Sequence, residues 1–190
     1  MPNQRLPRAG LKFVFWGMLI SAVWSVVQRS VELNPLLSSA PAWVSTVLIL
    51  AGIWRLAHCN DHFRSSRVLY FVNLGLSLLS MLVSMGSSEE LMAIGLLLVI
   101  ATLIVGFAAV YQLCAGITQA AGNVGQRELA AQVTQRARHY ILSLASAFAG
   151  SYVFPLTGAL GAILMIGVVV YMAVALVLLL IILYRASDVL

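Results

Sequence analysis

The run LMAIGLLLVIATLIVGFAAVYQLCAGI, from Leu91 to Ile117, contains no charged residue and no proline. It is longer than the roughly 20 helical residues that cross a hydrocarbon core of about 30 Å. Because lipid offers no hydrogen bonds to an exposed backbone, a spanning segment of this kind must be helical. We therefore interpret the run as a transmembrane helix, and the chain as an all-α integral membrane protein.

The composition of the whole chain agrees with this interpretation. Hydrophobic residues make up 62% of the 190 residues and charged residues only 9%, which lies outside the range of soluble globular domains. No long polar stretch leaves room for a soluble domain. We expect residues 1–190 to form one transmembrane helical domain, with the lipid bilayer as its main partner.

Breaks that contain charge, proline or glycine divide the chain into six apolar segments. The second and fifth segments are short for a bilayer, and the fourth and sixth are long. A continuous helix from Glu128 through the fifth segment would supply the length that this segment lacks. The sequence predicts a bundle of six transmembrane helices, with spans at residues 11–27, 42–57, 68–85, 91–117, 140–154 and 156–184.

The basic residues predict the orientation of this bundle. If the N-terminus is cytoplasmic, Arg29 is the only one of the 11 lysine and arginine residues that falls outside, as the positive-inside rule requires. Both termini are then cytoplasmic. The net charge of +5 follows from this topology, and no loop has the dense basic and aromatic mixture typical of nucleic-acid binding.

One polar segment between the fourth and fifth spans is more than a turn. In residues 125–139, GQRELAAQVTQRARH, the apolar positions repeat with helical spacing opposite a basic face. We predict a cytoplasmic amphipathic helix here. Its arginines would contact anionic lipid head groups, at about 1 kcal/mol each, or a partner protein; they are Arg127, Arg136 and Arg138.

The stretch HCNDHFRSSR, from His58 to Arg67, collects several potential metal ligands. His58 and His62 are spaced i, i+4, so a helix would place both imidazoles on one face, with Cys59 and Asp61 nearby. The spacing matches no closed four-ligand pattern, however, and the two flanking arginines repel a divalent cation. We interpret the stretch as a solvated turn and expect no metal site.

Neutral polar residues form stripes within the predicted spans. A carboxamide inside an apolar span must face another helix, a cavity or a ligand, because lipid cannot satisfy it. Small and hydroxylated stripes also let helices pack closely in lipid. Both interpretations, bundle packing and a polar cavity, apply to the same candidate residues: Asn73, Ser77 and Ser80 on the third span, Gln112 on the fourth, and Ser143 and Ser146 on the fifth. Gln112 and Ser143 lie at a depth comparable to that of Asn73, and we expect them to be its partners.

Signatures of catalysis are missing from the sequence. It has no Walker loop, no G-x-S-x-G motif and no pair of carboxylates within a span. The pair Glu89 and Glu90 falls in an outside loop and lacks the downstream arginine of membrane-embedded CAAX-type proteases. No Asp, Glu or Lys lies in the middle of a span, which disfavours proton-coupled transport. We expect no catalytic residue and no cofactor.

The outline of six spans in 190 residues, with both ends inside, resembles the substrate-binding subunits of vitamin transporters of the energy-coupling type. Many bacterial inner (plasma) membrane proteins share this outline. The resemblance is one of shape and carries over no residues. It implies a non-enzymatic small-molecule-binding or transport subunit that works with a partner membrane protein or as a homo-oligomer. The alternatives are an assembly or regulatory protein that docks membrane proteins or lipids and, third, a membrane-embedded enzyme without a recognisable motif.

Overall fold

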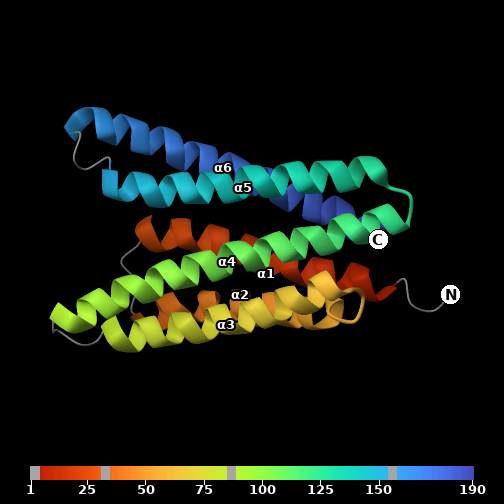
Figure 1. The fold of residues 1–190 in the computed structure, drawn as a ribbon, viewed down its shortest axis with the longest axis horizontal. Helices are drawn as coiled ribbons and strands as arrows, with labels where there is room; N and C mark the ends of the chain where they lie inside the picture. The colour runs from red at the N-terminus through yellow and green to blue at the C-terminus, as the bar shows by residue number, and fades with distance from the viewer. Residues whose placement is uncertain (1–4, 31–34, 85–88, 154–157) are drawn as a thin grey trace.

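A computed structural model describes residues 5–30, 35–84, 89–153 and 158–190 of the chain (Figure 1). Every regular element in these ranges is an α-helix, so the all-helical class predicted from hydropathy is confirmed. The helices are α1 (Arg5–Ser30), α2 (Pro35–Leu56), α3 (Asp61–Ser84), α4 (Glu89–Asn123), α5 (Arg127–Val153) and α6 (Gly158–Val189).

Three of these helices contain stretches that are long and apolar enough to cross a membrane. The stretches are Asp61–Val83 in α3, Ala93–Asn123 in α4 and Gly161–Val189 in α6. In α2 the apolar stretch Trp43–Leu56 is shorter. The length and apolar composition of these helices indicate that the protein associates with a membrane, because a stretch of about 20 such residues matches the hydrocarbon thickness.

The helices pack as three antiparallel hairpins, α1 with α2, α3 with α4, and α5 with α6. Contacts of α4 with α5, of α1 with α6 and of α2 with α3 join the hairpins. Both chain termini lie at one end of the bundle, together with the α2–α3 and α4–α5 turns (Figure 1). We call the half of the bundle nearer this end the terminal half, and the other the distal half.

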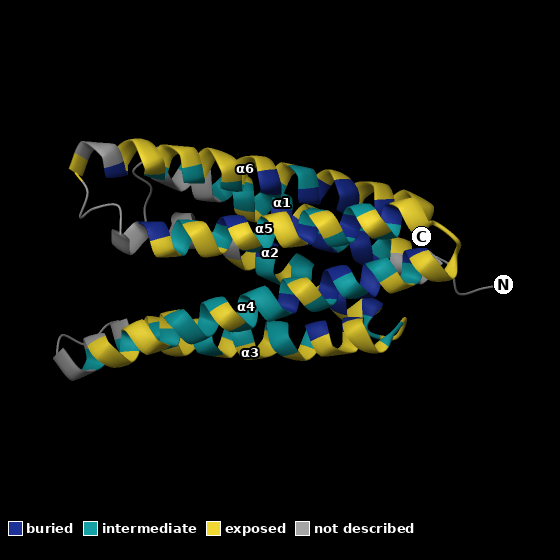
Figure 2. Ribbon diagram, turned by 45° about the horizontal axis from the view of Figure 1, so that its top comes forward, coloured by how far each residue is buried: buried dark blue, intermediate teal, exposed yellow. Residues whose placement is uncertain are grey.

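The hydrophobic core lies in the terminal half. Its largest fully buried side chains include Leu11, Ile53, Phe63, Leu113 and Leu183, and buried residues gather toward the end that carries the termini (Figure 2). In the distal half, large apolar side chains stay exposed instead, among them Leu82 of α3, Leu97 of α4 and Ile163 of α6. The helices are therefore held together mainly in the terminal half.

Glycines set the close approach of α1 to α2. A Cβ atom on Gly52 would lie 2.6 Å from the Gly10 carbonyl oxygen and 2.9 Å from the Val14 nitrogen. A Cβ on Gly17 would lie 2.9 Å from the Ser45 carbonyl oxygen. These neighbours are backbone atoms that cannot move aside, so only glycine fits. Such contacts between small residues are the means by which helices associate in lipid.

From Arg127 onward, the predicted amphipathic segment 125–139 belongs to the same helix as the fifth apolar segment, which confirms the continuous helix expected from Glu128. It forms the first half of α5, which continues without a break from Arg127 to Val153. Its apolar positions Leu129, Val133 and Ala137 are buried in the core, so this face packs along the bundle. Neither glycine nor proline interrupts residues 127–149, which leaves nothing to end the helix there.

A glycine in the left-handed conformation ends α4 and forms the turn to α5. Gly125 has a φ of 78°, a left-handed conformation that glycine adopts without steric cost. The Gln126 nitrogen donates to the Ala121 carbonyl oxygen at 2.9 Å, and the Gly125 nitrogen donates to that of Gly122 at 3.1 Å. This is a Schellman-type ending, and it turns the chain directly from α4 into α5.

Candidate ligand-binding site

The stretch from His58 to Arg67 forms the start of α3 and its attachment to α4. Asn60 caps the helix, because its Oδ1 accepts a hydrogen bond from the Phe63 nitrogen at 2.9 Å. Its Nδ2 donates to the Gly116 carbonyl oxygen of α4 at 3.0 Å. Within the described residues, no group of three or more His, Cys, Asp or Glu side chains lies close enough together to hold a metal ion.

Further contacts join α3 to α4, and we call the line of contact between these two helices the α3–α4 seam. The Phe63 ring covers Gly116, where a Cβ atom would lie 2.7 Å from the ring. One turn later, Ser66 Oγ donates to the Ala109 carbonyl oxygen at 3.0 Å. His62 also bonds to α4, with its Nδ1 2.8 Å from Gln112 Oε1.

Beside His62, a pocket of about 350 Å³ opens between α4 and α5. One face of α4 supplies most of its wall, since residues 111, 114, 115, 118 and 119 repeat with helical spacing. The first half of α5 supplies the opposite wall. The lining residues are His62, Tyr111, Cys114, Ala115, Thr118, Gln119, Thr134 and Ala137.

A pair of hydroxyl groups connects the two walls of this pocket. Thr118 Oγ1 lies 3.2 Å from Thr134 Oγ1, and each hydroxyl oxygen also lies within hydrogen-bond distance of a carbonyl oxygen of its own helix, that of Cys114 at 2.9 Å and that of Ala130 at 3.1 Å. Because a hydroxyl has one proton, one threonine donates to the other while its partner donates to its own helix. Such bonds to the i−4 carbonyl satisfy a threonine inside a helix. The hydrogen bond between the two hydroxyls therefore links α4 to α5, and their remaining lone pairs can accept further hydrogen bonds.

The lining combines an apolar base with a polar rim. Cys114 and Ala137 are buried, whereas Tyr111, Gln119 and His62 are exposed. No lysine, arginine or carboxylate contributes to the lining. Neutral donors and acceptors over an apolar base suit a small amphipathic molecule, whose polar end finds hydrogen bonds while its apolar part is buried.

The predicted Asn73 face lies on the seam between α3 and α4, away from this pocket. Asn73 Oδ1 is buried and has no hydrogen-bond partner, and it faces Gly106 of α4, whose Cβ position would lie 3.6 Å away. Ser77 Oγ donates to the Asn73 carbonyl oxygen of its own helix at 2.8 Å. Ser80, on the same face, is half-buried. Asn73 therefore faces another helix.

The other polar residues predicted for this face have partners of their own. Gln112, expected near Asn73, bonds instead to His62. Ser143 is fully buried and donates to the Tyr140 carbonyl oxygen of its own helix at 2.7 Å. Ser146 is exposed. The antiparallel register explains the difference, because it sets Gly106 opposite Asn73 and moves Gln112 toward the start of α3.

The three arginines predicted to contact lipid head groups lie on the polar side of α5. Arg127 and Arg138 are exposed and Arg136 is half-buried. The neighbouring Glu128 accepts a hydrogen bond at its Oε1 from Gln132 Nε2 at 3.0 Å. In the described parts of the chain none of the three forms an ion pair within 4.0 Å. Contact with lipid head groups stays a prediction.

Reasoning from the sequence missed most of the pocket. The predicted fourth span ends at Ile117, but α4 continues to Asn123, so Thr118 and Gln119 fell outside the predicted span. The available signal was the stripe Tyr111, Thr118 and Gln119 on one helix face. The sequence also does not show the partner of His139, the last residue of the predicted amphipathic segment, whose Nδ1 lies 3.0 Å from the Tyr171 hydroxyl of α6.

Comparison of the chain with models of protein families, with curated proteins and with solved structures finds no match.

Proposed function

We propose that the protein is a six-span protein of the bacterial inner membrane that has both termini in the cytoplasm. In this proposal it acts as a non-enzymatic binding or transport subunit and holds a small amphipathic molecule in the pocket between α4 and α5. It works with a partner membrane protein or as a homo-oligomer. The observation that carries the binding role is the 350 Å³ pocket with its neutral polar rim.

The positions of the charges support the proposed topology. Most basic residues of the described ranges belong to the terminal half, which would face the cytoplasm under the positive-inside rule; Arg29, near the end of α1 in the distal half, is the exception. Those of the terminal half include Arg8, Lys12, Arg55, Arg64, Arg67, Arg127, Arg136, Arg138 and Arg185. The apolar second half of α5, which packs against α6, supplies the fifth span, and α1 and α2 supply the first two.

The pocket supports a particular class of ligand. Its volume lies at the lower end of the range for small-molecule sites, about 300–1,000 Å³. Thr118, Thr134 and Gln119 would bind a hydroxyl, carbonyl or amide group of the ligand. Ala115 and the Tyr111 ring would cover its apolar part. In the proposed topology the pocket opens toward the cytoplasmic leaflet, from which an amphipathic molecule enters without crossing water.

The binding role is tested by filling the pocket. Ala115→Phe places a ring between the walls, and Gly122→Phe on the same helix is the control, because a Cβ there meets no atom within 4 Å. Mass spectrometry of small molecules that co-purify with the protein should detect one compound with the wild type and the control. We expect about tenfold less with Ala115→Phe, as for a loss of about 1.4 kcal/mol. Equal amounts from all three proteins, with unchanged thermal unfolding, would contradict a ligand in this pocket.

The topology is tested separately by labelling cysteines in sealed membrane vesicles. An impermeant maleimide should reach Cys59 only from the cytoplasmic side. In a Cys59→Ser background, it should reach a cysteine introduced by Ser88→Cys only from the outside. Position 88 lies outside the described residues, in the connection between α3 and α4. Labelling of both cysteines from the same side would overturn the six-span arrangement.

A further inference from the structure

Two arginine side chains of the terminal half lie over aromatic rings. Arg67 of α3 has its guanidinium carbon 4.9 Å from the centre of the Trp54 ring of α2. Arg55 of α2 lies 4.9 Å from the centre of the Phe13 ring of α1. Trp54 also meets Phe71 edge-on, with ring centres 6.2 Å apart. We call these five residues, together with Arg64, the arginine–aromatic patch.

Trp54 is the centre of this patch and connects α2 to α3. More than half of its surface is exposed, although Arg67 and Phe71 both contact its ring. Arg64 is exposed and precedes Arg67 by three residues on α3, so both point to the same side of the helix. The stacked arginine has few conformations left, because attraction between a cation and a ring holds its guanidinium in place.

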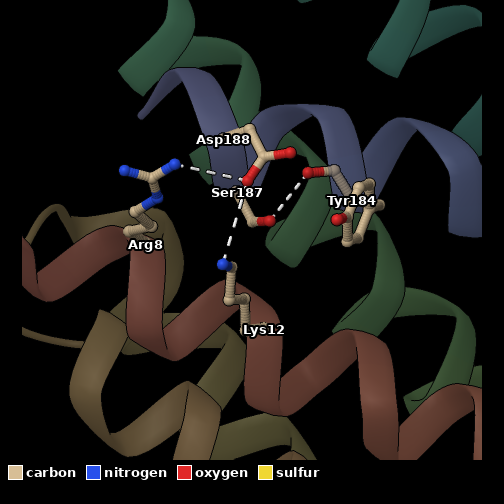
Figure 3. Close-up of polar contacts among 5 residues, drawn as sticks. All are labelled: Arg8, Lys12, Tyr184, Ser187 and Asp188. Carbon is tan, nitrogen blue, oxygen red and sulfur yellow. Dashed lines mark hydrogen bonds and ion pairs between the residues drawn. The ribbon is translucent and has the colours of Figure 1, made fainter.

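Within the ranges that the structure describes, no carboxylate neutralises the positive charge of the patch. Among the described residues, ion pairs within 4.0 Å are made only by Arg8 and Lys12, which meet the same Asp188 oxygen at 3.4 and 3.8 Å. Figure 3 shows this pairing of α1 with α6, which involves no residue of the patch. The nearest acid along the chain, Asp61, forms no ion pair with Arg64 or Arg67. The patch therefore presents unpaired guanidinium groups beside an exposed tryptophan.

The surface beyond the patch is apolar. Val47 of α2 and Val72 of α3 are exposed, and they lie farther from the terminal end than Trp54 and Arg67. A stacked guanidinium keeps its N–H edges free for the oxygens of a phosphate group, which it binds with two parallel hydrogen bonds. A phosphate at the arginines with an apolar chain along Val47 and Val72 matches this surface.

We infer that the arginine–aromatic patch binds the head group of an anionic phospholipid of the same leaflet, with an acyl chain along α2 and α3. The inference rests on the proposed topology, which puts the patch in the cytoplasmic leaflet, where anionic lipids concentrate. Tryptophan at the level of the head groups is typical of this depth. The site is distinct from the pocket between α4 and α5 and from the arginines of α5.

Native mass spectrometry of the detergent-solubilised protein tests this site. The protein is titrated with phosphatidylglycerol and, for comparison, with phosphatidylcholine. Arg67→Gln and Trp54→Leu should each weaken phosphatidylglycerol binding about fivefold, as expected for one basic contact of about 1 kcal/mol. Arg185→Gln removes the same charge from an exposed arginine at the end of α6 and should leave the binding unchanged.

Three results would overturn the inference. Equal weakening by Arg67→Gln and Arg185→Gln would indicate general attraction to positive charge. Equal binding of phosphatidylcholine would remove the role of the anionic head group. Displacement of the lipid by millimolar inorganic phosphate would make the patch a phosphate site without a lipid chain. Binding in detergent does not depend on orientation, so labelling of Cys59 in vesicles reports failure of the topology independently.

Discussion

The terminal and distal halves of the bundle are held together in different ways. In the terminal half, side chains such as Phe63 and Leu113 are fully buried, and polar contacts such as that of Asn60 with Gly116 connect neighbouring helices. In the distal half, Leu82 and Ile163 are among the most exposed side chains. The contrast shows that the terminal half organises the helices, whereas the distal half leaves large apolar side chains on its surface.

The physical reason lies in the surroundings that we propose for each half. Acyl chains are as apolar as leucine, so a helix gains little by burying leucine against another helix in the middle of a bilayer. Near the head groups and water, apolar side chains are driven inward again, and polar groups require partners. The pocket and the arginine–aromatic patch both belong to the terminal half, where hydrogen-bonding and charged side chains are available to a ligand.

The largest effect that separates the two halves is expected from truncating a core side chain. Phe63→Ala should lower the free energy of unfolding by about 3 kcal/mol or more, because it empties the contact with Gly116. Leu82→Ala, at a side chain that is 66% exposed, should change it by much less. Thermal unfolding in detergent measures both. Similar losses from the two variants would show that the halves are equally well packed and would break the comparison.

The next effect concerns the close approach of α1 and α2. Gly52→Ala should destabilise the protein by about 1–3 kcal/mol, since the new Cβ meets backbone atoms of α1. Gly75→Ala in α3 is the matched control, because a Cβ there has no neighbour within 4 Å, and alanine favours a helix. We expect the control to keep or raise the unfolding temperature. If Gly52→Ala is as stable as the control, the two helices are not in close contact.

A smaller effect is expected where the α3–α4 seam passes toward the distal half. Asn73 Oδ1 is buried without a hydrogen-bond partner, and Gly106→Ser would place a donor hydroxyl beside it. We expect Gly106→Ser to exceed Gly106→Ala in stability by about 0.6 kcal/mol, the usual size of a hydrogen bond between helices in lipid. The advantage should disappear when both changes are made in an Asn73→Ala background. An advantage that persists there would show that the serine acts without Asn73.

The number and approximate positions of the helices could be predicted from hydropathy, because each apolar segment between polar breaks is long enough to form a helix of its own. The length of α5 could also be predicted, because no glycine or proline interrupts residues 127–149. What hydropathy cannot show is which helix faces meet. Gln112 was expected beside Asn73, but the register of α3 on α4 pairs it with His62. The pocket depends on the meeting of Thr118 with Thr134, which belong to different helices.

The smallest effect concerns Cys59, in the turn between α2 and α3. Partial burial raises the pKa of its thiol above the ordinary value, because desolvation disfavours the thiolate. The folded state thus favours the protonated thiol, and its contribution to stability is lost only as the pH rises above the ordinary thiol pKa.

Since the thiolate is the reactive form, alkylation of Cys59 at neutral pH should be slower than that of a free thiol, with its pH profile shifted upward. Asn123→Cys in a Cys59→Ser background, exposed at the end of α4, should follow the profile of a free thiol. Rates of maleimide reaction between neutral and alkaline pH measure both. If the two profiles coincide, the packing of the terminal half does not extend to this turn, and the difference between the two halves is confined to the helices.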